Sequence, residues 1–140
     1  VGYTGRHCPD ELADHFALVR DARDLVVPYI EQAFSDNRNV TGSELDSLVR
    51  TYLSSRADPS WIRHRTGHAI DHACHGSGVN LDCIEFPDNR PVIEGSCFSV
   101  EPGLYGDRFG MRIEIDVYIH NGKPVISGLP IQNTILVIQD

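Results

Sequence analysis

Residues 111–122 read Met-Arg-Ile-Glu-Ile-Asp-Val-Tyr-Ile-His-Asn-Gly, and this stretch decides the fold. Apolar and polar side chains alternate over its first ten residues, which predicts one long strand with an aliphatic face and a polar face. The Asn-Gly pair at its end is typical of a two-residue hairpin turn and leads into a further strand at residues 124–126. Arg112 and Glu114 are therefore expected on the polar face, away from a core on the aliphatic side.

Two amphipathic helices are predicted upstream of this sheet. The first spans residues 10–34, because apolar residues recur there at helical spacing, and Pro28 inside it predicts a kink or a local break. The second runs to about residue 55 and opens with a capping box, in which Thr41 is followed three residues later by Glu44. Helices of this kind bury their apolar stripe against another layer, which the sheet provides.

Further strands are predicted at residues 1–5, 97–101 and 134–138, where short apolar runs are bounded by glycine, proline or polar residues. Helices followed by antiparallel strands are typical of an α+β fold, in which the helices cover one face of the sheet. The 140 residues thus predict a single domain, residues 1–140, with two helices packed on an antiparallel sheet.

The composition excludes some classes of function. The net charge of −8 argues against nucleic-acid binding, which needs a basic face. No apolar run approaches the roughly 18 residues of a membrane span, so no membrane partner is predicted. The four cysteines are Cys8, Cys74, Cys83 and Cys97; they form no Cys-x-x-Cys pair, and we expect free thiols in a reducing cytoplasm.

A histidine-rich stretch precedes the strands. Residues 64–75 read His-Arg-Thr-Gly-His-Ala-Ile-Asp-His-Ala-Cys-His and hold four of the chain's seven histidines. Two acidic motifs follow, one containing Glu101 and the other Glu114. Imidazole and carboxylate are ligands that suit zinc, manganese, iron and cobalt, so the pattern predicts one side of a metal site. The alternative is a polar loop with two solvent-facing glutamates.

The order and spacing of these motifs resemble the pita-bread metallopeptidases, the family of methionine aminopeptidase, aminopeptidase P, prolidase and creatinase. That family carries a Gly-His pair, a second histidine seven residues later, a Glu-Pro-Gly turn and an Arg-x-Glu strand. His64 resembles an additional histidine of the prolidase and aminopeptidase P branch. The likeness is strong over residues 60–120 and implies a pita-bread fold. The matching segments are Gly67-His68, His75, Glu101-Pro102-Gly103 and Arg112-Ile113-Glu114.

The resemblance implies a centre of two divalent metal ions (manganese, cobalt or zinc). Its ligands in this chain would be His68, Glu101 and Glu114, with Glu114 bridging the two ions. The family adds two aspartates upstream of the first helix, whereas residues 1–8 contain no carboxylate. We therefore expect this chain to be the C-terminal part of a pita-bread catalytic domain, an inactive fragment with at most one weakly held metal ion.

The resemblance also implies catalytic roles. His75 and His64 would hydrogen-bond the substrate amide and the tetrahedral intermediate, Glu101 would shuttle a proton, and Arg112 would orient a substrate carbonyl or carboxylate. The implied activity is that of an Xaa-Pro aminopeptidase or an Xaa-Pro dipeptidase, acting in the cytoplasm as a homodimer on peptides with proline at the second position. Two alternatives are a non-catalytic pita-bread binding module and a creatinase-like C–N hydrolase, which needs no metal.

Two other interpretations of the histidine stretch are weaker. His64, His68 and His72 lie four residues apart, as zinc ligands on a helix would, but no glutamate follows His64 or His68 to act as the general base of a zincin. His72 is therefore expected to be an ordinary histidine. Cys74 and His75 could form a nucleophile pair, but adjacent residues of a strand point apart, which argues against it.

Overall fold

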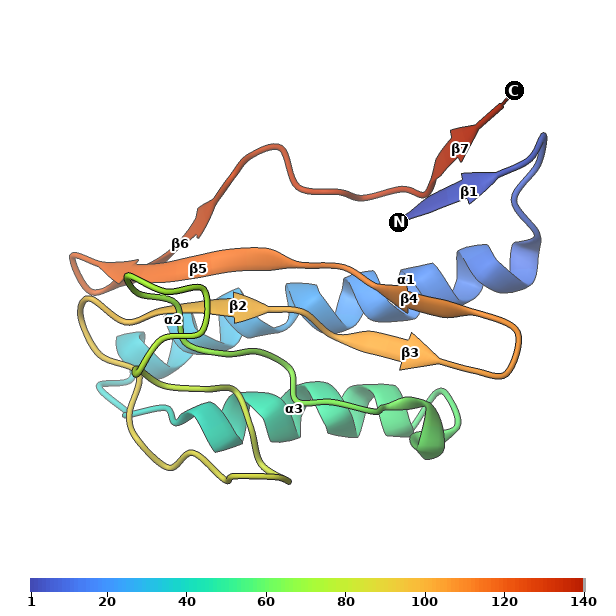
Figure 1. The fold of residues 1–140 in the computed structure, drawn as a ribbon. Helices are drawn as coiled ribbons and strands as arrows, with labels where there is room; N and C mark the ends of the chain where they lie inside the picture. The colour runs from blue at the N-terminus through green and yellow to red at the C-terminus, as the bar shows by residue number, and fades with distance from the viewer. Residues whose placement is uncertain (140) are drawn as a thin grey trace.

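The structure has the two layers that an α+β fold requires. It is a computed structural model that describes residues 1–139, and Figure 1 shows helices α1 and α2 behind the strands, with α3 packed against both. The helices are α1 (Asp10–Asp24), α2 (Val26–Ser35) and α3 (Gly42–Ser54), followed by a 3₁₀ turn at Pro59–Trp61. The strands are β1 (Gly2–Thr4), β2 (Cys97–Val100), β3 (Gly103–Tyr105), β4 (Gly110–Arg112), β5 (Ile115–His120), β6 (Lys123–Ser127) and β7 (Leu136–Ile138).

The strands form three groups. β2, β5 and β6 make an antiparallel sheet in that order, and β3 pairs antiparallel with β4. The predicted antiparallel sheet does not include the strand near the C-terminus, because β7 pairs in parallel with β1. Since β1 and β7 lie at opposite ends of the chain, this pair brings the two ends together (Figure 1).

The predicted alternation of residues 111–120 holds throughout. Ile115, Val117 and Ile119 are at most 5% exposed and join one hydrophobic core with residues of all three helices, such as Val26 and Leu45. The polar residues between them face away from the helices, toward the side on which the histidine-rich segment lies. The sheet therefore has one structural face and one face that is free for chemistry.

The first predicted helix is in fact two helices, and the break lies at Leu25 rather than at Pro28. Pro28 has no N–H to donate to the carbonyl of Asp24, and its ring crowds that carbonyl, so the helix is interrupted one turn earlier. Pro28 then falls in the first turn of α2, where a missing N–H removes no helical bond. No helix among residues 1–139 combines the length and the apolar character needed to cross a bilayer.

The predicted capping box of α3 is half formed. Thr41 Oγ1 accepts a hydrogen bond from the Glu44 backbone N–H at 3.2 Å, as an N-cap should. The Glu44 carboxylate turns instead to the Tyr29 hydroxyl and the Arg38 guanidinium, which both donate to it. Glu44 thus joins α3 to α2 rather than closing its own helix end.

Residues 62–96 connect α3 to β2 and contain no helix or named strand. Isolated bridges pair Gly67 with Leu81 and Ala69 with Phe98, so this segment extends the sheet beside β2. A Cβ atom at Gly67 would lie 1.9 Å from the Ser99 carbonyl oxygen, so any side chain at this position would clash with the backbone of β2. The glycine before His68 is therefore required for the close approach that brings the histidine to the sheet.

Candidate functional site

The two motif glutamates lie opposite each other at an interruption in the long hairpin. Val100 pairs with Ile115 and, further along, Gly103 pairs with Arg112. The register is the same on both sides of the interruption, so Glu101 faces Glu114 with no residue inserted in either strand. Pro102, which has no N–H, stands in the gap, and this is why the predicted strand at 111–120 is divided into β4 and β5.

His68 reaches the same point from the neighbouring segment. The Ser99 N–H donates to the His68 carbonyl at 2.9 Å, and the His68 N–H donates to Ser99 Oγ at 3.0 Å, so the backbone is held on both sides. The His68 ring Nδ1 lies 3.0 Å from the Ala69 carbonyl oxygen, which can only accept. Nδ1 is therefore the donor, and in the neutral ring Nε2 offers its lone pair 3.4 Å from Glu101 Oε1.

The ligand atoms of His68, Glu101 and Glu114 all lie within 4.8 Å of one another. His68 and Glu101 are each only 7% exposed, while Glu114 opens to solvent. A fixed imidazole tautomer with a free nitrogen, beside two carboxylates on rigid strands, is the arrangement that divalent cations require. The donor set therefore fits a metal ion, and the three residues predicted as ligands are brought together.

The ligand cluster has an excess of negative charge, because two carboxylates share one guanidinium. Burial raises the pKa of Glu114, and the neighbouring charge of Glu101 raises it further, against a smaller lowering by Arg112. Arg112 Nη1 lies 3.0 Å from Glu101 Oε2, and its Nη2 lies 3.9 Å from Glu114 Oε2. Arg112 thus offsets part of the charge of both carboxylates, and the remainder favours a bound cation.

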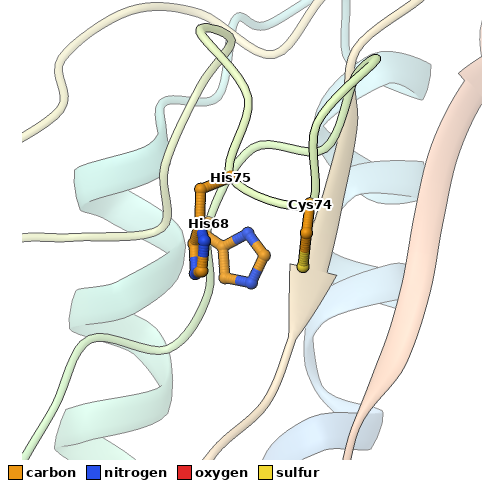
Figure 2. A group of neighbouring side chains, drawn as sticks. All are labelled: His68, Cys74 and His75. Carbon is orange, nitrogen blue, oxygen red and sulfur yellow. The ribbon is translucent and has the colours of Figure 1, made fainter.

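His75 lies against His68, with the ring centroids 4.3 Å apart. Cys74 joins them, since ligand atoms of His68, Cys74 and His75 lie within 4.8 Å of one another (Figure 2). The expectation that Cys74 and His75 point apart is wrong, because residues 71–75 form a bend and not a strand. His72, in the same bend, is exposed and belongs to neither group.

His64 takes a different place. Its Nδ1 lies 2.7 Å from the Arg65 carbonyl oxygen and its Nε2 lies 2.8 Å from the Tyr105 hydroxyl, which therefore donates to it. Burial raises the pKa of Tyr105, so this hydroxyl keeps its proton at neutral pH. The structure brings His64 to Tyr105 of β3, but it does not bring it into the ligand group.

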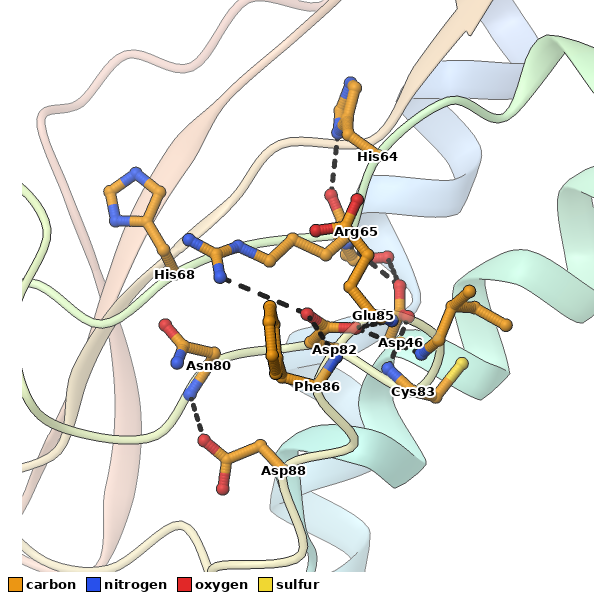
Figure 3. Close-up of polar contacts among 12 residues, drawn as sticks. Asp46, His64, Arg65, His68, Asn80, Asp82, Cys83, Glu85, Phe86 and Asp88 are labelled. Atoms are coloured by element: carbon orange, nitrogen blue, oxygen red, sulfur yellow. Dashed lines mark hydrogen bonds and ion pairs between the residues drawn. The ribbon is translucent and has the colours of Figure 1, made fainter.

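Asp46 on α3 holds the histidine-rich segment in place through hydrogen bonds (Figure 3). It is not among the site residues predicted from the sequence. Its buried carboxylate accepts bonds from Thr66 N (2.9 Å), Thr66 Oγ1 (2.6 Å), Cys83 N (2.8 Å) and Arg50 Nε (2.8 Å). Burial alone raises the pKa of Asp46, but these hydrogen bonds outweigh it and the pKa is lowered. The available signal was an aspartate beside the buried stripe of α3, four residues before Arg50.

The fold and the order of the motifs are those of the pita-bread metallopeptidase family. The model of Metallopeptidase family M24 matches residues 3–121, and the chain belongs to this family. The family and the α+β fold that were predicted from the sequence are thereby confirmed.

Individual relatives agree with this assignment. The uncharacterized peptidase YqhT of Bacillus subtilis (strain 168) is 31% identical over 132 residues, which are 91% of this chain and 34% of the relative. An Xaa-Pro dipeptidase of Lactobacillus delbrueckii subsp. lactis is 37% identical over 81 residues, 54% of this chain and 20% of the relative. The solved structure of X-Pro aminopeptidase from Thermotoga maritima MSB8 aligns with a TM-score of 0.76 at 26% identity, over 94% of this chain and 35% of that chain. The chain thus spans about a third or less of the length of these relatives.

Proposed function

We propose that His68, Glu101 and Glu114 are three ligands of a two-metal centre in a peptidase that hydrolyses Xaa-Pro bonds. The observation that carries this proposal is the convergence of their ligand atoms within 4.8 Å, on a sheet face that the core does not use. The likeness to an Xaa-Pro dipeptidase and an X-Pro aminopeptidase supports the choice of substrate, a peptide with proline at the second position.

Within residues 1–139 the ligand group around His68, Glu101 and Glu114 contains no aspartate. We propose that the two aspartates of the family pattern come from outside this chain, and that alone it holds at most one metal ion weakly. Mixed imidazole and carboxylate ligands suit manganese, cobalt and zinc, and manganese is the ion we propose. Bound cations would supply Lewis acidity, which polarises a peptide carbonyl and acidifies a water molecule.

Glu101 is the proposed proton acceptor. Ser99 Oγ donates to Glu101 Oε1 at 3.2 Å and Arg112 holds Oε2, so the carboxylate is oriented from both sides. A proton from the attacking water would move to Glu101 and then to the leaving amine. Arg112, which is half exposed, would in addition orient a substrate carbonyl or carboxylate at the open edge.

His75 and His64 are the residues proposed to hydrogen-bond the substrate. The exposed ring of His75 lies beside the ligand His68 and can donate an N–H to the oxygen of a reacting carbonyl. The Nε2 atom of His64, which accepts from the Tyr105 hydroxyl on β3, could accept instead from the N–H of a peptide amide.

The test combines metal binding and hydrolysis. Manganese affinity is measured by calorimetry, and hydrolysis of an Xaa-Pro dipeptide and a longer Xaa-Pro peptide is measured with full-length protein. His68→Ala should weaken manganese binding at least about tenfold, and Glu101→Gln should lower kcat by about 10²–10⁴-fold. The matched control is His120→Ala, which removes an exposed imidazole elsewhere and should change neither.

The outcomes separate the alternatives. Metal binding without any hydrolysis would favour a non-catalytic binding module, and hydrolysis that survives His68→Ala would favour metal-independent chemistry of the creatinase type. The ratio of dipeptide to longer-peptide cleavage decides between dipeptidase and aminopeptidase. Either of the first two results would end the proposal of a two-metal Xaa-Pro peptidase.

We also propose a cytoplasmic homodimer. The four cysteines are free, which fits a reducing compartment. Apolar side chains of Leu136 and Val137 on β7 are exposed, which fits a surface that another chain covers. Cell fractionation and light scattering are the measurements that test the two points.

A further inference from the structure

The loop that carries Cys74 and His75 is built around one carboxylate. Asp71 Oδ1 accepts a hydrogen bond from the Ala73 N–H at 3.0 Å, and Oδ2 accepts bonds from Ser77 N (2.9 Å) and Ser77 Oγ (3.2 Å). The Gly76 N–H donates to the Ala69 carbonyl at 2.7 Å and closes the loop onto the sheet. A Cβ atom at Gly76 would lie 2.8 Å from the Asp71 carboxylate carbon, so a glycine is needed there.

This closure presents a thiol and two imidazoles to one another. Figure 2 shows Cys74 and His75 of the loop beside His68 of the sheet, and their ligand atoms lie within 4.8 Å of one another. A tetrahedral zinc site, with Zn–S of about 2.3 Å and Zn–N of about 2.0 Å, has ligand atoms roughly 3.3–3.5 Å apart. The exposed side chains of Cys74 and His75 can close this difference by rotation, while His68 stays fixed.

We propose that His68, Cys74 and His75 form a second cation site, selective for thiophilic divalent ions of the zinc class, which competes with the His68–Glu101–Glu114 group for His68. Binding replaces the thiol proton of Cys74 with the metal ion and releases that proton to solvent. Three protein ligands leave the fourth tetrahedral position to water, because the loop side of the site is exposed.

Competition follows from the tautomer of His68. Its Nδ1 is committed to the Ala69 carbonyl, so Nε2 is the one ring nitrogen with a free lone pair. One lone pair binds one ion, and the two groups therefore cannot both hold a cation through His68. Carboxylate oxygens favour hard ions such as manganese, whereas a thiolate favours zinc, so the identity of the metal decides which partners His68 takes.

The consequence is inhibition by excess zinc. An ion held by Cys74 and His75 would remove His68 from the carboxylate group and occupy the imidazole that we propose as a substrate donor. The site itself does not depend on the proposed peptidase activity, because its three ligands stand close together whatever the carboxylates do. Its test can therefore rest on spectroscopy rather than on hydrolysis.

The experiment is a titration of the purified, reduced protein with Co²⁺ as the probe, followed by displacement with Zn²⁺. A cysteine thiolate bound to Co²⁺ gives a charge-transfer absorption in the near ultraviolet, which imidazole and carboxylate ligands do not give. We expect this band in the wild type and in the matched control Cys8→Ser, and its loss in Cys74→Ser. His75→Ala and His68→Ala should each weaken the affinity that the band reports at least about tenfold.

A second measurement uses the reactivity of Cys74. Zn²⁺ should protect its exposed thiol from alkylation, measured by mass spectrometry, and Mn²⁺ should not, while Cys8 stays reactive with both ions. The proposal is overturned if the band is absent from the wild type or persists in Cys74→Ser. An affinity that His68→Ala leaves unchanged would likewise overturn the sharing of His68, whatever the peptidase assay gives.

Discussion

Asp46 and Glu114 are both carboxylates beside the histidine segment, yet they differ in almost every physical respect. Asp46 is fully buried and accepts four hydrogen bonds, so its pKa is lowered (Figure 3). Glu114 is partly exposed, faces a second carboxylate and has a raised pKa. A carboxylate whose partners all come from the protein stabilises the fold, whereas one that lacks them is available to a ligand.

The largest expected effect that tests this contrast is on Asp46. Asp46→Ala should lower the free energy of unfolding by about 3–5 kcal/mol, because it leaves the donors of Thr66, Cys83 and Arg50 without their buried acceptor. Urea denaturation followed by circular dichroism measures the change. Asp14→Ala, an exposed aspartate on α1, is the control and should stay within about 0.5 kcal/mol. A loss below about 1 kcal/mol for Asp46→Ala would remove the structural side of the contrast.

The next effect concerns Glu101, which is buried like Asp46 but belongs to the ligand group like Glu114. Glu101→Gln should weaken manganese binding at least about tenfold, or about 1.4 kcal/mol, because one charged ligand is lost. Stability should change by much less than for Asp46→Ala, since the amide oxygen can still accept from Arg112 while the amide NH₂ group donates to Ser99 Oγ. Calorimetry and urea denaturation on the same preparation give both numbers. Equal losses of metal affinity in Glu101→Gln and Asp46→Asn would show that the two carboxylates do not differ as described.

Asp88 is an intermediate case and allows a pH test. Hydrogen bonds from Arg90 lower the pKa of Asp88 from 3.8 to about 2, and the Asn80 N–H adds to this. A lowered folded-state pKa means that the stabilisation is present above pH 3.8 and is lost as the pH falls toward 2. Asp88→Asn should therefore cost about 1 kcal/mol at neutral pH, reduced by the exposure of Arg90 to solvent.

The measurement for Asp88 is the unfolding free energy of wild type and variant between pH 7 and pH 2. The two curves should converge as the pH falls from 3.8 toward 2, because the unfolded chain gains its proton first and the folded carboxylate only near pH 2. Curves that stay parallel down to pH 2 would show that the Asp88 pair contributes no charge-dependent stability.

The smallest effect has the opposite sign and falls on Glu114. A raised folded-state pKa means that the charged form is disfavoured by folding, so stability is lost as the pH rises through that pKa. Glu114→Gln should therefore stabilise the metal-free protein at pH 7, by a few tenths of a kcal/mol because the side chain is partly exposed. Thermal unfolding at pH 7 and at pH 4 measures this, and the gain should shrink at the lower pH. A destabilised variant at pH 7 would contradict the charge argument.

Much of the fold was accessible from the sequence because its signals are local. The alternation of residues 111–120 fixed the buried and exposed faces of the sheet, and Thr41 marked the start of α3. Pro28 predicted a kink or a break, and the break lies one turn earlier, at Leu25, because the clash of a proline acts on the carbonyl four residues earlier. The parallel pairing of β1 with β7 joins the two ends of the chain, and no local pattern encodes such a contact.

The candidate site divides in the same way. The separate motifs around His68, Glu101 and Glu114 converge, as their order suggested, while their roles in binding metal remain predictions. Asp46 was missed because its importance comes from donors at Thr66 and Cys83, which are distant along the chain. The position of Cys74 beside His68 was missed because the bend of residues 71–77 depends on several hydrogen bonds to Asp71 at once.

The shared register on either side of the Glu101–Glu114 gap also limits where this hairpin can accept insertions and deletions. Removing or adding one residue at Pro102 would turn every following side chain of β3 to the other face and separate the two glutamates. The same change at the hairpin tip, where Arg108 is 84% exposed, would leave both pairings intact. Insertions and deletions among related sequences should therefore occur at residues 107–108 and be absent from residues 100–103 and 112–115.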